Sequence, residues 1–267
     1  MTPQYYFDKN PLNTGSSLPP LALFLDFDGT LTPIQQHPDR ATVKGEIRAL
    51  LTSILGTGKS VLAILSGRPL ADLEKRISIQ GAYYAGSHGL EIKGPGMRYI
   101  HEPALSVKPV IDKIRHNLAL EIERLPGVRI EEKPFSFALH YRGVPNRIAS
   151  MAQKAFYGVV ETIPADAPPC TVMAGKKVLE LVPCPSWNKG AAALHIMAGM
   201  DKEYLPVCLG DDVTDETLFE TFRGKGVTIK VGPLRNSVAT YYLNDQREVL
   251  GFLQNINDLL SPSEELS

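Results

Sequence analysis

Five short apolar runs in this sequence each lead into polar or very small residues. The runs cover residues 21–28, 61–67, 82–89, 206–212 and 226–232, and their ends read DFDGT, SGR, GSHG, GDD and KVG. Helical patterns such as LADLEKRIS lie between them, and alternating strands and helices are typical of a parallel sheet with helices on both faces. Ligands bind at the carboxyl edge of such a sheet, so the sequence predicts a functional site where these ends meet.

The middle of the chain has a different pattern, in which helices alternate with pairs of strands. The expected helices cover residues 106–124 and 146–158, and the expected strands cover residues 128–133, 135–143, 171–176 and 177–183. This order indicates a separate α+β unit, and prolines near residues 103 and 183–185 would mark the two crossings. We therefore predict an α/β fold: a Rossmann-like parallel-sheet core, with helices on both faces, formed by residues 20–105 and 186–267, plus an inserted α+β domain at residues 106–185.

The composition argues against several classes of protein. Lys and Arg total 28 and Asp and Glu total 29, and a net charge of −1 argues against binding to nucleic acid or to an anionic membrane. No apolar run approaches the roughly 18 residues of a membrane span. Residues 1–19 mix Asn, Pro, Gly and Ser without periodicity, so they are predicted to be a flexible tail and not a secretory signal.

The three cysteines, Cys170, Cys184 and Cys208, show no CxxC spacing. Neither a disulfide framework nor a zinc site is therefore expected. We expect a cytoplasmic protein, and the lack of an extended apolar face favours a monomer.

The first polar strand end carries two carboxylates, Asp26 and Asp28. Residues two apart in a strand share a face, so these side chains would repel each other unless a cation or a shared proton compensates. A hard divalent cation prefers oxygen ligands of this kind. The alternative is a simple turn at the Asp-Gly pair.

A second acidic cluster follows the fourth apolar run, where GDDVTDE places four acidic residues within seven positions. Such a cluster is unfavourable without a nearby cation. Asp211 is hard to explain in any other way, whereas Asp215 lies near the start of the next helix and could serve only to cap it.

Two further motifs are suited to binding an anion. Ser66 stands at a strand end just before a helix, where a hydroxyl and backbone N–H groups can hold an oxyanion; a simple helix cap is the alternative. Lys189 lies in the first turn of a helix capped by Asn188, a place where the helix dipole disfavours a cation. A bound anion would explain this lysine, and an exposed side chain is the alternative. Together the motifs suit magnesium-dependent phosphoryl transfer.

In this order the motifs resemble the four signatures of the haloacid dehalogenase superfamily of phosphatases: Asp26 with Asp28, then Ser66, then Lys189, then the loop that begins at Asp211. The longer strings DFDGTLTPI, LSGR, GSHGLE, FALHYR, GKKVLEL, NKGAA and GDDVTDE look like the trehalose-6-phosphate phosphatases of that superfamily. The resemblance covers roughly residues 20–255 and shows no departure at the catalytic positions.

The resemblance implies a role for each catalytic residue. Asp26 would be the nucleophile that forms an aspartyl phosphate. Asp28 would protonate the departing sugar oxygen and then deprotonate the water that hydrolyses the intermediate. Ser66 and Lys189 would hold the oxygens of the transferring phosphoryl group.

The same resemblance implies a Mg²⁺ site. The ion would be held by the Asp26 carboxylate, the backbone carbonyl of Asp28 and Asp211. Asp212 and Asp215 would not bind the ion directly. They would orient the residues that do, or pair with Lys189.

The inserted domain is implied to be a cap that recognises the sugar. The candidate contacts on its strands are Glu131, Lys133, Arg142, Lys176 and Glu180, each of which could alternatively belong to a solvated strand face. Gly67, Arg68 and His88 are the candidates at the mouth of the core, although a structural role suits His88 equally well. His140 is expected to pack in a hydrophobic core.

The implied activity is hydrolysis of trehalose 6-phosphate to trehalose and phosphate, paired with a trehalose-6-phosphate synthase. Two alternatives stay open. One is a phosphatase for another sugar phosphate, such as sucrose or mannosyl-glycerate phosphate. The other is a sugar-phosphate sensor without catalysis, against which the intact set of catalytic residues argues.

Overall fold

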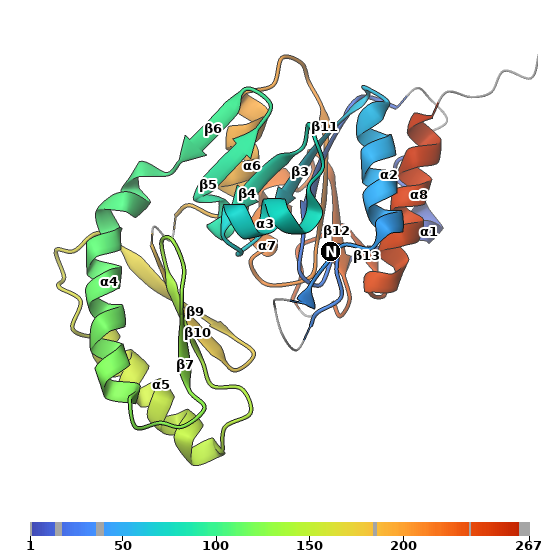
Figure 1. The fold of residues 1–267 in the computed structure, drawn as a ribbon. Coiled ribbons are helices and arrows are strands. Elements are labelled where there is room, and N and C mark those ends of the chain that lie inside the picture. Colours follow the sequence, from blue (N-terminus) through green and yellow to red (C-terminus); the bar gives the residue numbers. More distant parts are fainter. Residues whose placement is uncertain (1, 14–17, 36–39, 184–185, 235, 262–267) are drawn as a thin grey trace, which may run out of the picture. The chain divides into compact units, whose positions relative to one another are not determined.

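The computed structural model describes residues 2–13, 18–35, 40–183, 186–234 and 236–261 (Figure 1). The chain separates into two compact units. The core unit consists of Met1–Tyr99 and Asn188–Ser267, and the inserted unit consists of Ile100–Trp187. Each unit is described by itself.

The core unit is built on a nine-stranded sheet in the order β1-β13-β12-β11-β2-β3-β4-β5-β6. The strands are β1 (Gln4–Tyr5), β2 (Leu21–Asp26), β3 (Ser60–Leu65), β4 (Tyr83–Gly86), β5 (Glu91–Gly94), β6 (Met97–Ile100), β11 (Leu205–Gly210), β12 (Val227–Val231) and β13 (Tyr241–Leu243). All five predicted core strands are present, as β2, β3, β4, β11 and β12, and they pair in parallel. β2 is central and every one of its residues is buried. Its continuous apolar sequence is therefore explained by burial on both faces.

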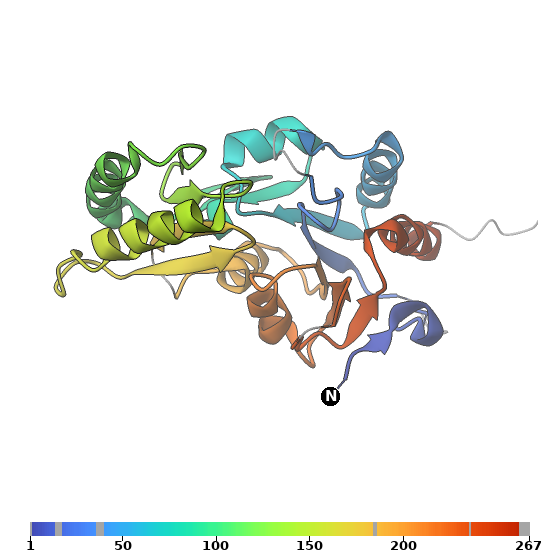
Figure 2. The same ribbon diagram turned by 90° about the horizontal axis from the view of Figure 1, so that it is seen from below.

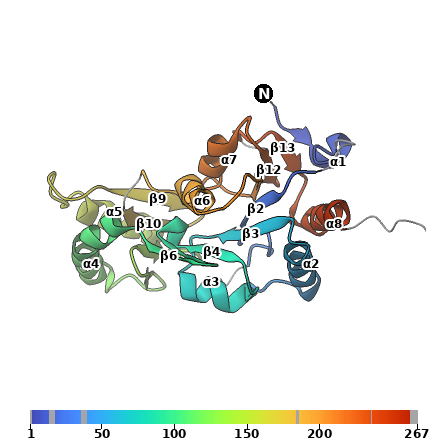
Figure 3. The ribbon, with the colours of Figure 1, turned by 90° about the horizontal axis from the view of Figure 1, so that it is seen from above.

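Helices cover both faces of this sheet, as predicted for a Rossmann-like core. The helices are α2 (Gly45–Gly56), α3 (Leu70–Ile77), α6 (Lys189–Ala198), α7 (Glu216–Phe222) and α8 (Val249–Leu260). Figure 3 shows α2, α3 and α8 on one side of the sheet and α6 and α7 on the other. Figure 2 shows α2 and α8 side by side. Asn188 caps α6 as predicted, because its side chain accepts a hydrogen bond of 3.1 Å from the backbone N–H of Ala191.

The predicted flexible tail at residues 1–19 is wrong for its first part. β1 pairs in parallel with β13, and the short helix α1 (Tyr6–Lys9) follows it. Tyr6 is fully buried, stacks edge-on against Phe252 and donates a 3.0 Å hydrogen bond to Asn255. Elements of two and four residues are too short to show periodicity in the sequence. These residues are held in place by contacts with residues far along the chain. Residues 14–17 of the predicted tail lie outside the described residues.

The inserted unit is a four-stranded antiparallel sheet in the order β7-β8-β10-β9 with two helices. Its elements are α4 (Glu102–Ile122), β7 (Arg129–Glu132), β8 (Phe137–His140), α5 (Asn146–Val160), β9 (Cys170–Gly175) and β10 (Val178–Pro183). Both helices lie on one side of this sheet (Figure 1). Phe137 and Leu139 are fully buried on that side. The alternate positions of the strands lie on the face that these two helices do not cover, which is called the open face below, although Ala138 on it is only 1% exposed.

The limits of this unit differ from the predicted 106–185. Helix α4 begins at Glu102 because Pro103 occupies its first turn, where a missing N–H costs no hydrogen bond. Pro103 therefore belongs to the first turn of α4 and does not mark a boundary in front of the helix. Residues 184–185 at the second predicted crossing, Cys184 among them, lie outside the described residues. Of the helices in the described part of the chain, none has both the length and the apolar character needed to cross a bilayer.

Candidate active site

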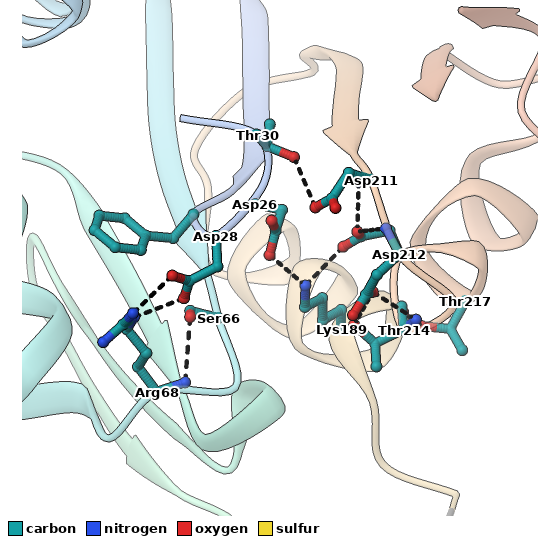
Figure 4. A network of polar contacts seen from close by, with 12 residues as sticks. Asp26, Asp28, Thr30, Ser66, Arg68, Lys189, Asp211, Asp212, Thr214 and Thr217 are labelled. Atoms are coloured by element: carbon teal, nitrogen blue, oxygen red, sulfur yellow. Dashed lines mark hydrogen bonds and ion pairs between the residues drawn. The ribbon is translucent and has the colours of Figure 1, made fainter. Parts of the chain in front are cut away.

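The carboxyl ends of β2 and β11 meet the start of α6 at a buried ion pair. Asp26 is the last residue of β2 and Lys189 is the first residue of α6. The Nζ atom of Lys189 donates a hydrogen bond of 2.6 Å to Oδ1 of Asp26 (Figure 4). It donates a second hydrogen bond of 2.6 Å to Oδ1 of Asp215. Lys189 and Asp215 are 2% and 0% exposed. The lysine is therefore not the exposed side chain that the sequence left as an alternative.

Asp215 shapes the acidic loop and does not cap the helix that follows it. Its Oδ2 accepts hydrogen bonds from the backbone N–H groups of Asp211 (2.9 Å) and Asp212 (3.0 Å), and it makes no side-chain cap to α7. The capping alternative for Asp215 is thus wrong. Gly210 permits this arrangement, because a Cβ at that position would overlap the Asp215 carboxyl group. The loop is folded around one buried carboxylate.

Asp211 lies against the turn that follows β2. The Cβ of any residue other than glycine at position 29 would overlap the Asp211 carboxylate, and Gly29 also has a φ of +91°, which favours glycine. Thr30 donates a 3.4 Å hydrogen bond to Oδ1 of Asp211. The Asp-Gly turn is therefore present, and its function is to let the second acidic cluster approach Asp26.

Burial dominates the electrostatics of this cluster. Burial raises the pKa of Asp26 well above its usual value, although the Lys189 ammonium acts in the opposite direction. Burial, with help from Asp215 and Asp212, raises the pKa of Asp211 to about 7. Burial alone would lower the pKa of Lys189, but the carboxylates of Asp215 and Asp26 raise it well above its usual value. Lys189 is therefore held as a cation at the centre of the site.

The cluster fits a divalent cation. Asp26, Asp211 and Asp215 each offer one carboxylate oxygen, and these oxygens all lie within 4.8 Å of one another. Among the described residues, Oδ2 of Asp26 is buried without a hydrogen-bond partner. A buried oxygen without a donor is unfavourable, and clustered carboxylate oxygens are the ligands that hard cations prefer. The residues present can therefore hold the metal that the sequence indicated.

Asp28 points to a different partner. Arg68 forms a fork on its carboxylate, with Nε 2.6 Å from Oδ2 and Nη2 2.6 Å from Oδ1 (Figure 4). The Arg68 guanidinium also lies over the ring of Phe27, 5.4 Å from its centroid. Asp26 and Asp28 thus differ in their partners although they are two residues apart, since one faces the lysine and the other faces an arginine.

Ser66 and its neighbours complete the edge between β3 and β4. Ser66 is 2% exposed, and its Oγ accepts a 3.2 Å hydrogen bond from the backbone N–H of Arg68. Gly67 leaves room for the His88 ring, because a Cβ there would lie 2.6 Å from a ring carbon. His88 itself has a φ of +58° in the turn after β4. The predicted core residues Ser66, Gly67, Arg68 and His88 are therefore neighbours in space.

Lys230 is a member of this cluster that the sequence reasoning missed. It lies near the end of β12 and is 5% exposed. Its Nζ donates to the backbone carbonyls of Asp211 (2.5 Å) and Asp212 (3.2 Å) and lies 3.8 Å from Glu216. The signal in the sequence is the polar strand end KVG, and nothing near it in the chain indicates that its partner is the acidic loop.

The candidate sugar-binding residues of the inserted unit gather on its open sheet face. Glu131 and Glu180 both pair opposite Ala138, so the two carboxylates stand on the same face. Glu180 accepts hydrogen bonds from Lys133 (2.8 Å) and Ser136 (2.6 Å). Glu131, Lys133 and Glu180 of the predicted sugar contacts therefore lie in one polar cluster.

Two other candidates of the inserted unit meet at the turn between β9 and β10. Arg142 donates a 3.2 Å hydrogen bond to the backbone carbonyl of Lys176. The expected core packing of His140 is wrong: its Nε2 lies 2.7 Å from Oε2 of Glu131 on the open face. Its neighbours Leu139 and Tyr141 are buried. The prediction that His140 faces away from these two residues is therefore correct, but the side it faces is the open face and not a hydrophobic core.

Known proteins are similar to this chain in sequence and in fold. The sequence model of the trehalose-phosphatase family matches residues 24–247. Trehalose-phosphate phosphatase B of Arabidopsis thaliana is 31% identical over 252 residues, covering 88% of this chain and 66% of the relative. The trehalose-phosphate phosphatase of Mycobacterium ulcerans is 35% identical over 223 residues, covering 81% of this chain and 55% of the relative. This chain thus spans roughly half to two thirds of the length of these two relatives.

The fold comparison agrees with the sequence comparison. The structure of the C-terminal domain of C. albicans trehalose-6-phosphate phosphatase superposes with a TM-score of 0.81 at 27% identity, covering 97% of this chain and 98% of that domain. The match therefore includes both the parallel-sheet core and the inserted α+β unit. With the family match over most of the chain, these similarities show that the chain belongs to the trehalose-phosphatase family.

Proposed function

We propose that this protein is a phosphoric monoester hydrolase that converts trehalose 6-phosphate to trehalose and phosphate. The observation that carries the proposal is the buried cluster in which Lys189 joins Asp26 to Asp215 beside Asp211. Such a cluster provides a nucleophile, a fixed cation and room for a metal at one point, which phosphoryl transfer requires. The family membership supports the choice of substrate.

In the first step, a carboxylate oxygen of Asp26 attacks phosphorus in line with the departing sugar oxygen. A bond forms between this oxygen and phosphorus, and the ester bond from phosphorus to the sugar breaks. Asp28, which accepts two N–H groups of Arg68 in the structure, takes up a proton on a remaining lone pair before this step. It gives that proton to the sugar oxygen, so that trehalose leaves as a neutral alcohol. Lys189 and Ser66 hold the oxygens of the transferring group, where fixed charges stabilise the transition state.

In the second step, a water molecule attacks the phosphorus of the aspartyl phosphate. Asp28, now a carboxylate, takes a proton from this water, and the bond from phosphorus to the Asp26 oxygen breaks. Asp26 returns to its carboxylate form and inorganic phosphate is released. One residue serves as acid and then as base, as microscopic reversibility requires of a two-step displacement.

The proposal includes Mg²⁺, held by the Asp26 carboxylate, the Asp28 backbone carbonyl and Asp211. The ion would neutralise negative charge as the phosphoryl group meets the nucleophile. Asp212 and Asp215 keep the loop in shape around this site, because Asp215 binds the backbone N–H groups of Asp211 and Asp212. The fit rests on the clustered carboxylate oxygens and on the unpartnered Oδ2 of Asp26.

The inserted unit is proposed to be the cap that recognises the sugar. Its contacts would be Glu131, Lys133, Arg142, Lys176 and Glu180, joined by Gly67, Arg68 and His88 from the core. Carboxylates and cations bind sugar hydroxyls strongly because charge-assisted hydrogen bonds are about twice as strong as neutral ones. The gathering of Glu131, Glu180 and Lys133 on one sheet face supports this role.

The cellular setting is part of the same proposal. We place the enzyme in the cytoplasm as a monomer, acting on the product of a trehalose-6-phosphate synthase. Among the described residues, Cys208 is a buried free thiol, which fits a reducing compartment.

Phosphate release by the purified chain tests the proposal. The substrates are trehalose 6-phosphate, sucrose 6-phosphate, glucose 6-phosphate and p-nitrophenyl phosphate, each with Mg²⁺ and with a chelator. We expect magnesium-dependent release with a strong preference for trehalose 6-phosphate. A preference for another sugar phosphate would overturn the substrate but not the chemistry.

The Asp26→Asn variant distinguishes an enzyme from a sensor. An enzyme loses turnover with this variant and still binds trehalose 6-phosphate, as measured by calorimetry. A wild-type protein that binds the sugar phosphate and releases no phosphate from any substrate would instead be a sensor.

A further inference from the structure

A chain of ion pairs leads from Asp28 out of the site along the start of α3. Arg68 binds Asp28 with Nε and Nη2 and turns Nη1 to Oδ2 of Asp72, at 3.1 Å. The same Oδ2 of Asp72 accepts a 2.7 Å hydrogen bond from Nε of Arg76. Arg76 in turn donates a 2.9 Å hydrogen bond to the backbone carbonyl of Ala41. All of these residues belong to the core unit.

We propose that Asp72 is a positioning residue for Asp28, acting through the guanidinium plane of Arg68. The inference rests on the proposed function, in which Asp28 protonates the departing sugar. Asp72 itself would touch neither the substrate nor the metal.

The geometry of the guanidinium carries the inference. Its N–H donors lie in one rigid plane, so two carboxylates on different edges and an aromatic ring beneath leave it little freedom to turn. Asp28 occupies one edge, Asp72 holds the Nη1 side, and Phe27 lies 5.4 Å below. Because Arg68 binds both oxygens of Asp28, the direction of that carboxylate follows the direction of the plane. Small errors in such directions are costly for proton transfer.

A simpler role for Asp72 would be to stabilise α3. An acidic residue in the first turn interacts favourably with the helix dipole, and Asp72 and Arg76 form an i,i+4 pair. This role does not account for Arg68, which precedes the helix and is held by the same carboxylate oxygen. The side chains of Arg68 and Arg76 are only 11% and 12% exposed, whereas Asp28 and Asp72 are 40% and 32% exposed. The two arginines are therefore fixed largely by packing, and their carboxylate partners are half-buried. Hydrogen bonds with Arg76 and Arg68 outweigh burial and lower the pKa of Asp72.

The leaving group distinguishes positioning from a structural role. A sugar alkoxide needs a proton to depart, whereas p-nitrophenolate is a good leaving group without one. The ratio kcat/KM reports the steps up to the release of the alcohol, so the later hydrolysis of the aspartyl phosphate does not enter. The measured quantity is therefore kcat/KM for trehalose 6-phosphate divided by kcat/KM for p-nitrophenyl phosphate. Because Arg68 is also a proposed sugar contact, the same quotient is measured with phenyl phosphate, a poorer leaving group without a sugar, in place of trehalose 6-phosphate. A fall seen only with trehalose 6-phosphate would indicate a lost sugar contact and would overturn the positioning role.

For Asp72→Asn we expect this quotient to fall about tenfold, a fraction of the roughly 10²–10⁴-fold that a general acid contributes. Asp72→Glu, which keeps the charge, should recover part of it. The matched control is Asp112→Asn, which removes an acid from an i,i+4 pair with Lys108 in α4 and should leave the quotient unchanged. An unchanged quotient for Asp72→Asn, whether kcat/KM falls equally on both substrates or on neither, would overturn the proposal.

A second measurement does not depend on turnover. The Nε–H group of Arg68, bound to Asp28 at 2.6 Å, should give a slowly exchanging proton signal in NMR spectra of the ¹⁵N-labelled protein. Asp72→Asn should speed that exchange at least tenfold, and Asp112→Asn should not. Exchange that is equal in wild type and Asp72→Asn would show that Asp72 does not hold the arginine. A wild type without phosphatase activity would overturn the proposed function alone, because this readout would still test the contact.

Discussion

The two units of this chain both carry charged side chains on strands, but they place them in different surroundings. In the core unit, Lys189 and Asp215 are almost completely buried and bound to each other. In the inserted unit, the side chain of Glu131 is 46% exposed and contacts His140, while Glu180 on the same face is 13% exposed and paired with Lys133. Buried charges must be balanced by neighbours in the folded chain, whereas exposed charges are balanced by water. The core site is therefore organised by folding itself, and the sheet face keeps charges that a polar ligand can reach.

The largest effect on stability is expected when a buried cation is removed. Lys189→Met leaves Asp26 and Asp215 buried without it and should lower the free energy of unfolding by about 3–5 kcal/mol. Lys108→Met removes an exposed pair with Asp112 in α4 and should cost only about 0.3–0.5 kcal/mol. Urea unfolding at pH 7 with a chelator, followed by circular dichroism, measures both. Similar losses of the free energy of unfolding in the two variants would contradict the difference between the buried and the exposed charges.

The next effect is a pH dependence that belongs to the core unit. Burial raises the pKa of Asp211 to about 7 in the folded protein, compared with about 4 in an unfolded chain. Between these values the folded state holds a proton that the unfolded state has released. The free energy of unfolding of the metal-free protein should therefore fall as the pH rises from about 4 to about 7.

Asp211→Asn isolates this contribution. The variant should show a shallower fall across the same pH window, and Mg²⁺ should stabilise the wild type most above pH 7, where Asp211 is ionised. Thermal unfolding midpoints from pH 4 to pH 8, with and without Mg²⁺, provide the data. A wild type and a variant with parallel pH profiles would contradict the raised pKa.

A smaller effect is expected at Lys230, whose ammonium holds two backbone carbonyls of the acidic loop. Lys230→Met leaves these carbonyls without their donor, which should cost about 1–3 kcal/mol of stability. It should also weaken Mg²⁺ binding, because the loop that carries Asp211 loses its support. Calorimetric titration with Mg²⁺ measures the affinity. A variant with wild-type affinity would mean that Asp215 alone shapes the loop.

The last comparison concerns two glycines, one in each unit, and includes the smallest expected change in stability. At Gly67 a methyl group would lie 2.6 Å from the His88 ring, so Gly67→Ala should destabilise the core by about 1–3 kcal/mol. At Gly158 in α5 a methyl group would meet nothing within 4 Å, so Gly158→Ala should stabilise the protein by about 0.5–1 kcal/mol. Opposite shifts of the two midpoints in thermal unfolding are expected. A midpoint for Gly67→Ala that equals or exceeds that of the wild type would show that the core tolerates the added group.

Much of the core could be predicted because its signals are local. A continuous apolar run such as residues 21–26 can be satisfied only by burial on both faces, and residues at the ends of parallel strands meet at one edge. The approach of Asp26 to Asp211, each at the end of a parallel strand, follows from this rule. Alternation along β8 also predicted correctly that His140 faces away from Leu139 and Tyr141.

The partners of these residues could not be predicted in the same way. Tyr6 is ordered by Phe252 and Asn255, which lie more than 240 residues further along the chain. Asp28 is bound by Arg68, and the sequence offered no reason to connect Asp72 to that pair.

The amino-acid sequence by itself determined the alternation of strands and helices, the inserted α+β unit and the edge at which the polar ends gather. It did so because periodicity and strand ends act over a few residues. Only the tertiary structure decided that Lys189 lies between Asp26 and Asp215, that Lys230 supports the acidic loop and that His140 faces Glu131. The physical reason is that a buried charge takes the partner that folding brings within hydrogen-bond distance, and separation along the chain does not limit that choice.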